Sequence, residues 1–239
     1  NQLKEIKKRV DKNNINFSCN FVLREYSQFK KIKEIIEKQL GKIFFVEGDY
    51  NYGRLEKIEK GWRGKIPYYS VTHGGAIHMI DLTLWFLNEL PYEVSSEGSR
   101  LVVKNKKFKT NDFTVSLLKF KSGKIVKISS NFGCMISHHH SLKVFGSKGS
   151  IIHDLRGGIL AKSRSKTEKL KKFNYLTNNE KKANVLKNFV VDILKKRKKI
   201  INENCKSIIN SMLVSLAIEK SIKEKKRIKI NFKTLNINE

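Results

Sequence analysis

The sequence has no long apolar run and no cysteine framework. Its longest unbroken apolar stretches are only a handful of residues, too short to cross a membrane. The three cysteines, Cys19, Cys134 and Cys205, are far apart and odd in number, which argues against a disulfide scaffold or a paired-cysteine metal site. We therefore expect a reducing, cytoplasmic setting. The chain also begins without Met or a signal peptide, and we interpret its start as a cut within a longer protein.

Acidic residues are few, and arginine is scarce among the basic ones. The chain of 239 residues has 50 Lys and Arg against 22 Asp and Glu, a formal net charge of +28. Such an excess could indicate binding to nucleic acid. However, only nine of the basic residues are Arg, and Lys is spread along the chain beside abundant Asn and Ile, as AT-rich codons would produce. Sequence-specific readers depend on Arg, so we keep nucleic-acid binding only as a disfavoured third hypothesis, testable by the salt dependence of heparin retention.

The hydrophobic periodicity alternates between helical and strand spacing. It predicts helices over residues 3–12, 29–40, 77–87, 183–194 and 207–223, and strands over residues 15–17, 43–52, 94–103, 113–120, 124–131, 139–145, 150–154 and 228–230. Short strands separated by turn residues are typical of an antiparallel meander. The sequence therefore predicts an α+β fold, with a mostly antiparallel open sheet and helices on one face.

Residues 53–72 show neither helical nor strand periodicity and are rich in glycine, charge and aromatic side chains. A loop of this length in a compact domain is usually functional. The aromatic and charged residues in and beside it could stack on a sugar and hydrogen-bond to it; the candidates are Tyr52, Trp62, Arg63 and Tyr69. Equally, these aromatics could simply fasten the loop to the surface.

His78 and Asp81 are three residues apart and so share a face of the predicted helix. A carboxylate beside a histidine can fix its tautomer and raise its basicity, as a general acid or base acting on an alcohol requires. By spacing alone, an ordinary capping or surface pair is the commoner explanation. His138 and His140 would share a strand face, but no carboxylate or cysteine lies at ligand spacing, so we expect no metal site.

Three segments resemble the Gfo/Idh/MocA family of oxidoreductases. Gly74 to Leu87 is similar to its glycine-rich turn and helix with His, two residues, then Asp-Leu. Asn20 to Arg24, followed by Leu40 to Ile43, resembles the strand with Asn and Arg that leads into its second domain. His140 to Ser150 resembles the strand that ends in Gly-Thr-x-Gly. The three segments occur in the family's order.

The resemblance implies an enzyme that transfers a hydride between NAD or NADP and a carbon of a sugar, inositol or sugar nucleotide. Residues 1–24 would be the last helix and strand of a Rossmann domain, and residues 25–239 an α+β substrate and oligomerisation domain. His78 would be the general acid or base with Asp81 as its orienter, while Asn20 and Arg24 would lie near the cofactor. The family also implies a homodimer or tetramer assembled through the sheet face.

Two departures from the family pattern qualify this expectation. The Gly-x-Gly-x-x-Gly phosphate loop and the Glu-Lys-Pro motif do not occur in the chain. On the family layout they would precede Asn1, so the chain alone is expected to be inactive. Many members also have Asp four residues before the histidine, where this sequence has Gly74. The main alternative is a truncated, non-catalytic relative that serves in assembly, and the DNA sequence upstream of Asn1 would separate the two.

Overall fold

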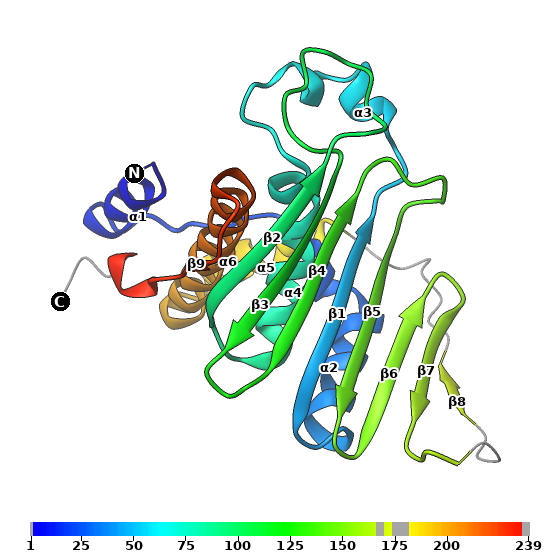
Figure 1. Ribbon diagram of the computed structural model, residues 1–239. Helices are drawn as coiled ribbons and strands as arrows, with labels where there is room; N and C mark the ends of the chain where they lie inside the picture. The colour runs from blue at the N-terminus through cyan, green and yellow to red at the C-terminus, as the bar shows by residue number, and fades with distance from the viewer. Residues whose placement is uncertain (1, 166–169, 174–181, 236–239) are drawn as a thin grey trace.

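Within the described residues, 2–165, 170–173 and 182–235 of a computed structural model, nine strands form one open sheet with helices on one face (Figure 1). The helices are α1 (Gln2–Lys12), α2 (Ser27–Gln39), α3 (Glu56–Glu59), α4 (Ile77–Leu87), α5 (Asn184–Leu194) and α6 (Lys198–Glu224). The strands are β1 (Ile43–Asn51), β2 (Pro91–Ser99), β3 (Phe113–Phe120), β4 (Ile125–Asn131), β5 (His139–Gly146), β6 (Gly149–Asp154), β7 (Gly157–Ala161), β8 (Lys171–Phe173) and β9 (Ile228–Lys229). The predicted α+β class is confirmed.

The strand order is β8-β7-β6-β5-β1-β4-β3-β2-β9. Only the β1–β4 pair is parallel; the other neighbouring pairs described are antiparallel. β1 lies in the middle of the sheet. The strands β5 to β8 follow one another on one side of it, and β4, β3, β2 and β9 follow on the other. Its end at Asn51 pairs with Asn131 of β4 and His139 of β5, so the ends of three strands meet at one edge.

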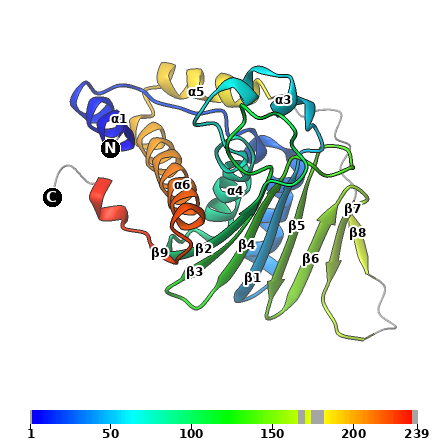
Figure 2. The ribbon, with the colours of Figure 1, turned by 45° about the horizontal axis from the view of Figure 1, so that its top comes forward.

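Helices cover the rear of the sheet, with α2 and α4 against its central strands and α6 beside α4 and against β2 (Figure 2). α4 is buried on nearly all sides because it lies between β1 and α6, which explains its apolar sequence. Gly48 of β1 permits this close approach, since a Cβ there would lie 3.1 Å from the terminal methyl of Met79. α4 ends at Asn88, whose φ of 48° is left-handed.

The structure differs from the predicted elements in several places. Asn20 to Arg24, expected to end a strand, lead instead into a 3₁₀ turn, Val22–Glu25, and the strand predicted over 94–103 is β2, which ends at Ser99. Residues 15–17 form no strand, because no neighbouring strand pairs with them in the described part of the chain. The predicted loop 53–72 contains the short helix α3 and a 3₁₀ turn, Trp62–Lys65. β7 and β8 were missed because each has at most five residues. α6 begins at Lys198 rather than near Ser207, since its first turns are polar and lack the apolar stripe that periodicity detects.

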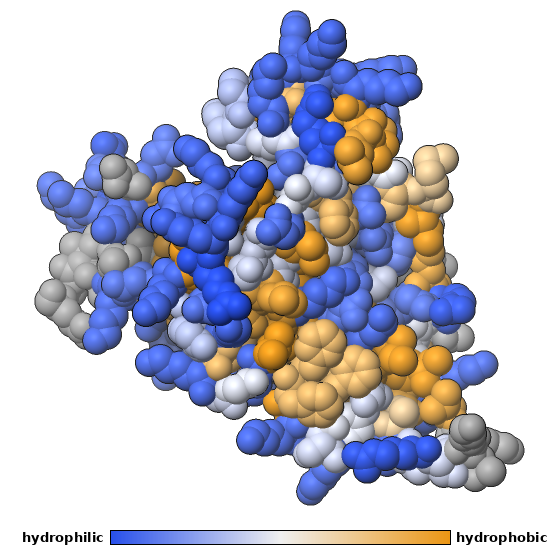
Figure 3. All heavy atoms as spheres, viewed as in Figure 1, coloured by the Kyte–Doolittle hydropathy of each residue, from blue (hydrophilic) through white to orange (hydrophobic). Residues whose placement is uncertain are grey.

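The front of the sheet carries no helix and combines an aliphatic and aromatic patch with charged side chains (Figure 3). Phe44 is 55% exposed, and the rings of Phe44 and Phe45 contact Phe145 at 6.5 and 5.9 Å between centroids. Nearby, Lys127 donates to Glu47 at 3.0 Å and to Asp49 at 2.7 Å. No helix in the described ranges is both long and apolar enough to span a bilayer.

Candidate active site

The glycine-rich segment before α4 forms a wide helical turn, Thr72–Ala76, that packs tightly against neighbouring aromatic side chains. A Cβ on Gly74 would lie 2.0 Å from the hydroxyl oxygen of Tyr69. A Cβ on Gly75 would lie 2.5 Å from Ser130 Oγ and 2.8 Å from the Tyr50 ring. Both positions therefore require glycine for close approach. The ring of Tyr69 thus occupies the space into which a side chain at position 74 would project.

His78, in the first turn of α4, lies beside the end of β1, next to Tyr50. Its imidazole stacks on Tyr50 at 5.7 Å between centroids and meets Phe21 edge-on at 6.0 Å. Burial lowers the pKa of His78 to about 4, so the ring is neutral at pH 7. Its buried Nδ1 atom has no hydrogen-bond partner among the residues that the structure describes. A neutral imidazole can accept a proton at a ring nitrogen, and here Nδ1 is enclosed by the protein without a described partner.

Asp81 does not orient His78, and this part of the prediction is corrected by the structure. Its carboxylate, 1% exposed, accepts hydrogen bonds from Arg24 Nε at 2.7 Å and Nη2 at 2.5 Å, and from Ser211 Oγ at 3.3 Å. A buried carboxylate pairs with a guanidinium because the two-pronged contact offsets the loss of hydration. Asp81 therefore fixes the segment containing Arg24 against α4 and α6.

Two histidines that we expected to be ordinary strand residues join this cluster. His138 and His140 lie 5.2 and 5.1 Å from the Tyr50 ring and 4.9 Å from each other. Burial is the main cause that lowers the pKa of His138 to about 4, and it lowers the pKa of His140 also. The buried Nε2 atom of His138 has no hydrogen-bond partner in the described part of the chain.

The alternation along β5 could have indicated this arrangement, because it places His138 and His140 on the same side as the buried Leu142. Buried polar atoms without partners are uncommon in folded proteins and point to a ligand or water. No set of three or more His, Cys, Asp or Glu side chains within the described ranges is arranged to hold a metal ion.

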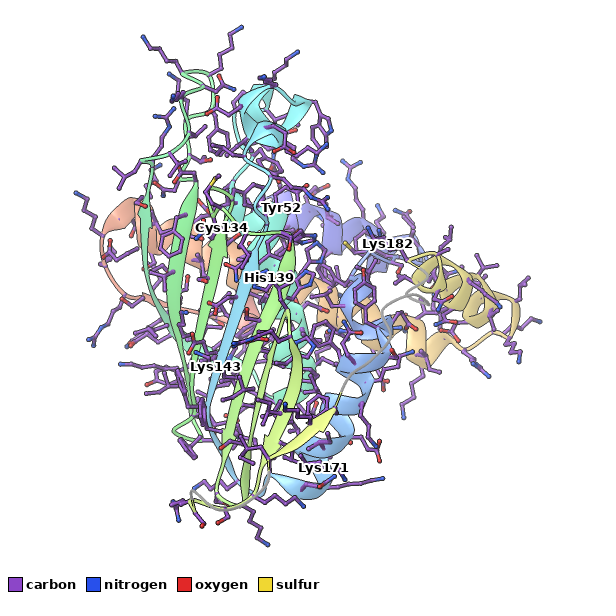
Figure 4. All side chains as sticks on the ribbon, turned by 90° about the vertical axis from the view of Figure 1, so that its right-hand side faces the viewer. Tyr52, Cys134, His139, Lys143, Lys171 and Lys182 are labelled. Carbon is purple, nitrogen blue, oxygen red and sulfur yellow. The ribbon has the colours of Figure 1, made fainter. Side chains whose placement is uncertain are left out.

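The four residues predicted to contact a sugar fall into two groups. Tyr52 is buried in the cluster, 4.4 Å from the ring of Phe132 and 5.1 Å from that of His138, and Figure 4 shows it at the same end of the sheet as His139. Trp62, Arg63 and Tyr69 form a second group. The Arg63 guanidinium lies 4.6 Å above the Trp62 ring, which meets Tyr69 edge-on at 6.3 Å. Burial raises the pKa of Tyr69 to about 12, so its hydroxyl stays protonated.

The two predicted cofactor residues lie in different surroundings. Asn20 is exposed and lines an open cleft of about 470 Å³ together with Cys19, Lys182 and Phe189. Arg24 is mostly buried by its contact with Asp81 and also donates to Ser207 Oγ at 2.6 Å. Its Nε and Nη2 atoms are thus bound by protein partners, whereas the side chain of Asn20 faces an open cleft.

A sequence model described as the GFO/IDH/MocA C-terminal domain matches residues 29–152, about half of the chain. The chain belongs to the GFO/IDH/MocA C-terminal domain family. The resemblance inferred from the motifs is therefore confirmed, and the matched range contains the wide turn, α4 and the strands β1–β5 that form the cluster. A search of curated proteins found no match.

Several solved structures share the fold of this chain. A NAD-binding oxidoreductase from Klebsiella pneumoniae has a TM-score of 0.73 at 13% identity, with 96% of this chain and 70% of that chain covered. Myo-inositol 2-dehydrogenase from Lactobacillus plantarum has a TM-score of 0.63 at 17% identity, with 88% of this chain and 64% of that chain covered. Scyllo-inositol dehydrogenase from Lactobacillus casei, solved with NAD(H) and scyllo-inositol, has a TM-score of 0.69 at 12% identity, with 95% of this chain and 69% of that chain covered. The GFO/IDH/MocA chain described here thus spans about two thirds of the length of these proteins.

Proposed function

We propose that this chain is the substrate-binding part of a nicotinamide-dependent oxidoreductase acting on a sugar or inositol, with His78 as general acid or base. The observation that carries the proposal is the neutral imidazole of His78, whose Nδ1 has no hydrogen-bond partner among the described residues, at the edge where β1 and β4 end and β5 begins. The inositol dehydrogenases among the structural neighbours act on polyols of this class.

His78 would take the proton of the substrate hydroxyl when the alcohol is oxidised and return it in the reverse direction. Tyr50 stacks on one side of the imidazole and keeps the ring plane fixed. Asp81 and Arg24 would act indirectly by holding α4 against the segment that precedes α2. The hydride chemistry itself would be supplied by NAD or NADP when bound.

The residues present fit only part of such a cofactor. The exposed Asn20 beside its open cleft could contact the nicotinamide end. The pyrophosphate needs a glycine-rich loop at a helix N-terminus, and no Gly-x-Gly-x-x-Gly occurs in the 239 residues. We therefore propose that a Rossmann half, of which residues 1–24 would be the end, completes the site.

The test is turnover by the enzyme that contains this chain, followed through NAD(P)H absorbance. His78→Gln should lower kcat by about 100- to 10,000-fold while leaving cofactor affinity nearly unchanged. His153→Gln, on β6, is the matched control because its ring is also buried but lies on a strand further from α4. Near-normal turnover in His78→Gln would refute the proposed role, and turnover by no form of the enzyme would favour a non-catalytic assembly module.

We also propose that the front of the sheet joins two copies of the chain. An exposed aromatic patch on a flat sheet face usually marks an interaction site. Phe44→Ser together with Phe145→Ser should shift the molecular mass measured by light scattering from oligomer to monomer. Leu101→Ser, in the exposed β2–β3 connection, is the control. A monomeric wild-type protein would contradict this assembly.

A further inference from the structure

The wide turn Thr72–Ala76 runs directly into α4 and sets the direction in which His78 points. The backbone N–H of Ile77 donates to the carbonyl of Thr72, five residues earlier, whereas the partner in a regular α-helix lies four residues earlier. The turn therefore contains one extra residue, which rotates the following residues by about 100° relative to a regular helix. Such turns are rare and occur mostly at functional sites.

Two strands hold the wide turn on its sheet side. The carbonyl of Val71, at the start of the turn, accepts a hydrogen bond from Ser130 Oγ of β4 at 2.9 Å. The hydroxyl of Thr72 pairs with that of Thr114 in β3 at 3.4 Å. All four residues are buried, so these contacts are shielded from competition by water.

His73 links the wide turn to α6, which lies on its other side. The Nδ1 atom of His73 lies 2.7 Å from the hydroxyl oxygen of Ser215, which is 0% exposed. Burial lowers the pKa of His73 below its ordinary 6.5, so the ring is neutral at pH 7 and can form a hydrogen bond with the hydroxyl. The backbone N–H of His73 also donates to Ser70 Oγ at 3.1 Å. Both the side chain and the backbone of His73 are therefore held.

We propose that His73 is a positioning residue, whose hydrogen bond to Ser215 holds the wide turn in the form that stacks His78 on Tyr50. The inference rests on the proposed function, because His73 would act on the reaction through His78 and not on the substrate. Without the bond, the turn can relax toward a regular helix. That relaxation would rotate the imidazole of His78 away from the Tyr50 ring, on which it now stacks at 5.7 Å between centroids.

The first experiment measures kcat, KM and cofactor affinity of the enzyme that contains this chain. Ser215→Ala and His73→Leu should each lower kcat by about 10- to 100-fold, because a misplacement of about 1 Å can have an effect of this size. KM and cofactor affinity should stay close to the wild-type values. The double variant should be no slower than the slower single variant, since both substitutions remove the same hydrogen bond. His73→Asn should restore most of the turnover, because its side-chain amide can replace Nδ1 as the partner of the Ser215 hydroxyl.

Ser221→Ala is the matched control. Ser221 is also buried on α6, but its hydroxyl accepts a hydrogen bond from the backbone N–H of Ser96 in β2, at 3.0 Å, and not from the wide turn. This variant should lose stability without losing kcat. A wild-type kcat in Ser215→Ala, an equal loss of kcat in Ser221→Ala, or a His73→Asn variant as slow as His73→Leu overturns the inference.

A second measurement does not depend on turnover. The ring protons of His78, followed by NMR at pH 7 in the purified protein, report the stacking on Tyr50, because an aromatic ring shifts the resonances of protons above its face. Ser215→Ala and His73→Leu should move these resonances, whereas Ser221→Ala should leave them in place. Unchanged His78 resonances in Ser215→Ala overturn the inference, whatever the kinetics show.

The inference and the proposed function fail in different ways. If His78→Gln abolishes turnover but Ser215→Ala changes neither kcat nor the His78 resonances, the catalytic role stands and the positioning role of His73 is wrong. If Ser215→Ala moves the His78 resonances but His78→Gln turns over normally, His73 does position His78 and the catalytic role is wrong.

Discussion

The buried contact between Arg24 and Asp81 gives the sharpest prediction for stability. Arg24→Leu removes the guanidinium and leaves the Asp81 carboxylate, 1% exposed, with the 3.3 Å contact from Ser211 as its one side-chain hydrogen bond from a described residue. Breaking a buried pair by removing one partner costs about 3–5 kcal/mol. For a chain of this size, that loss corresponds to a Tm lower by about 6–20 °C. Unfolding in urea, fitted with a common m-value, measures the loss directly.

The double variant tests whether the cost comes from the unpaired charge. Arg24→Leu with Asp81→Leu replaces the pair by apolar side chains and should recover most of the lost stability, because no buried carboxylate remains. Arg9→Leu is the control, since its contact with Glu5 is on the surface of α1, and it should leave the midpoint unchanged. A loss below about 1 kcal/mol in Arg24→Leu, or a double variant as unstable as the sum of the singles, would refute the reasoning.

Two further predictions concern the cluster and the turn before α4. The pKa of His138 and of His78 is about 4, below the ordinary 6.5, so the unfolded chain binds protons first and stability should fall as the pH is lowered from about 6.5 to 4. A urea midpoint that is constant over this range would contradict the burial of these rings. Gly74→Ala should destabilise the protein, because its Cβ would lie 2.0 Å from Tyr69 Oη, and adding Tyr69→Ala should recover part of the loss. If the two substitutions are additive in thermal unfolding, the close packing of Gly74 on Tyr69 is wrong.

The sequence predicted well those helices and strands whose apolar residues recur several times at a regular spacing. α2, α4, β3 and β4 begin and end within about two residues of the predicted bounds. Gly41, with a φ of 68°, follows α2 where the helix was predicted to end. Short elements such as β7 and β8 escaped detection, because their strand character comes from pairing with a neighbour rather than from their own period.

The candidate site was predicted only in part, because its contacts depend on tertiary structure. Spacing placed His78 and Asp81 on one helical face, but it could not show that Arg24, 57 residues earlier, would take both oxygens of the carboxylate. Similarly, His138 and His140 reach Tyr50 only because β5 pairs with β1 in a particular register. A strand sequence by itself carries no information about such a partner.

Chemical rescue of a His78→Ala enzyme tests the central claim most directly. The account predicts that His78→Ala loses turnover and that added imidazole restores a measurable part of it, rising with the concentration of the neutral base, since only the proton acceptor is missing. The same imidazole should not accelerate the wild-type enzyme. Turnover that survives in His78→Ala, or a lost turnover that imidazole does not restore, would contradict His78 as the general acid or base.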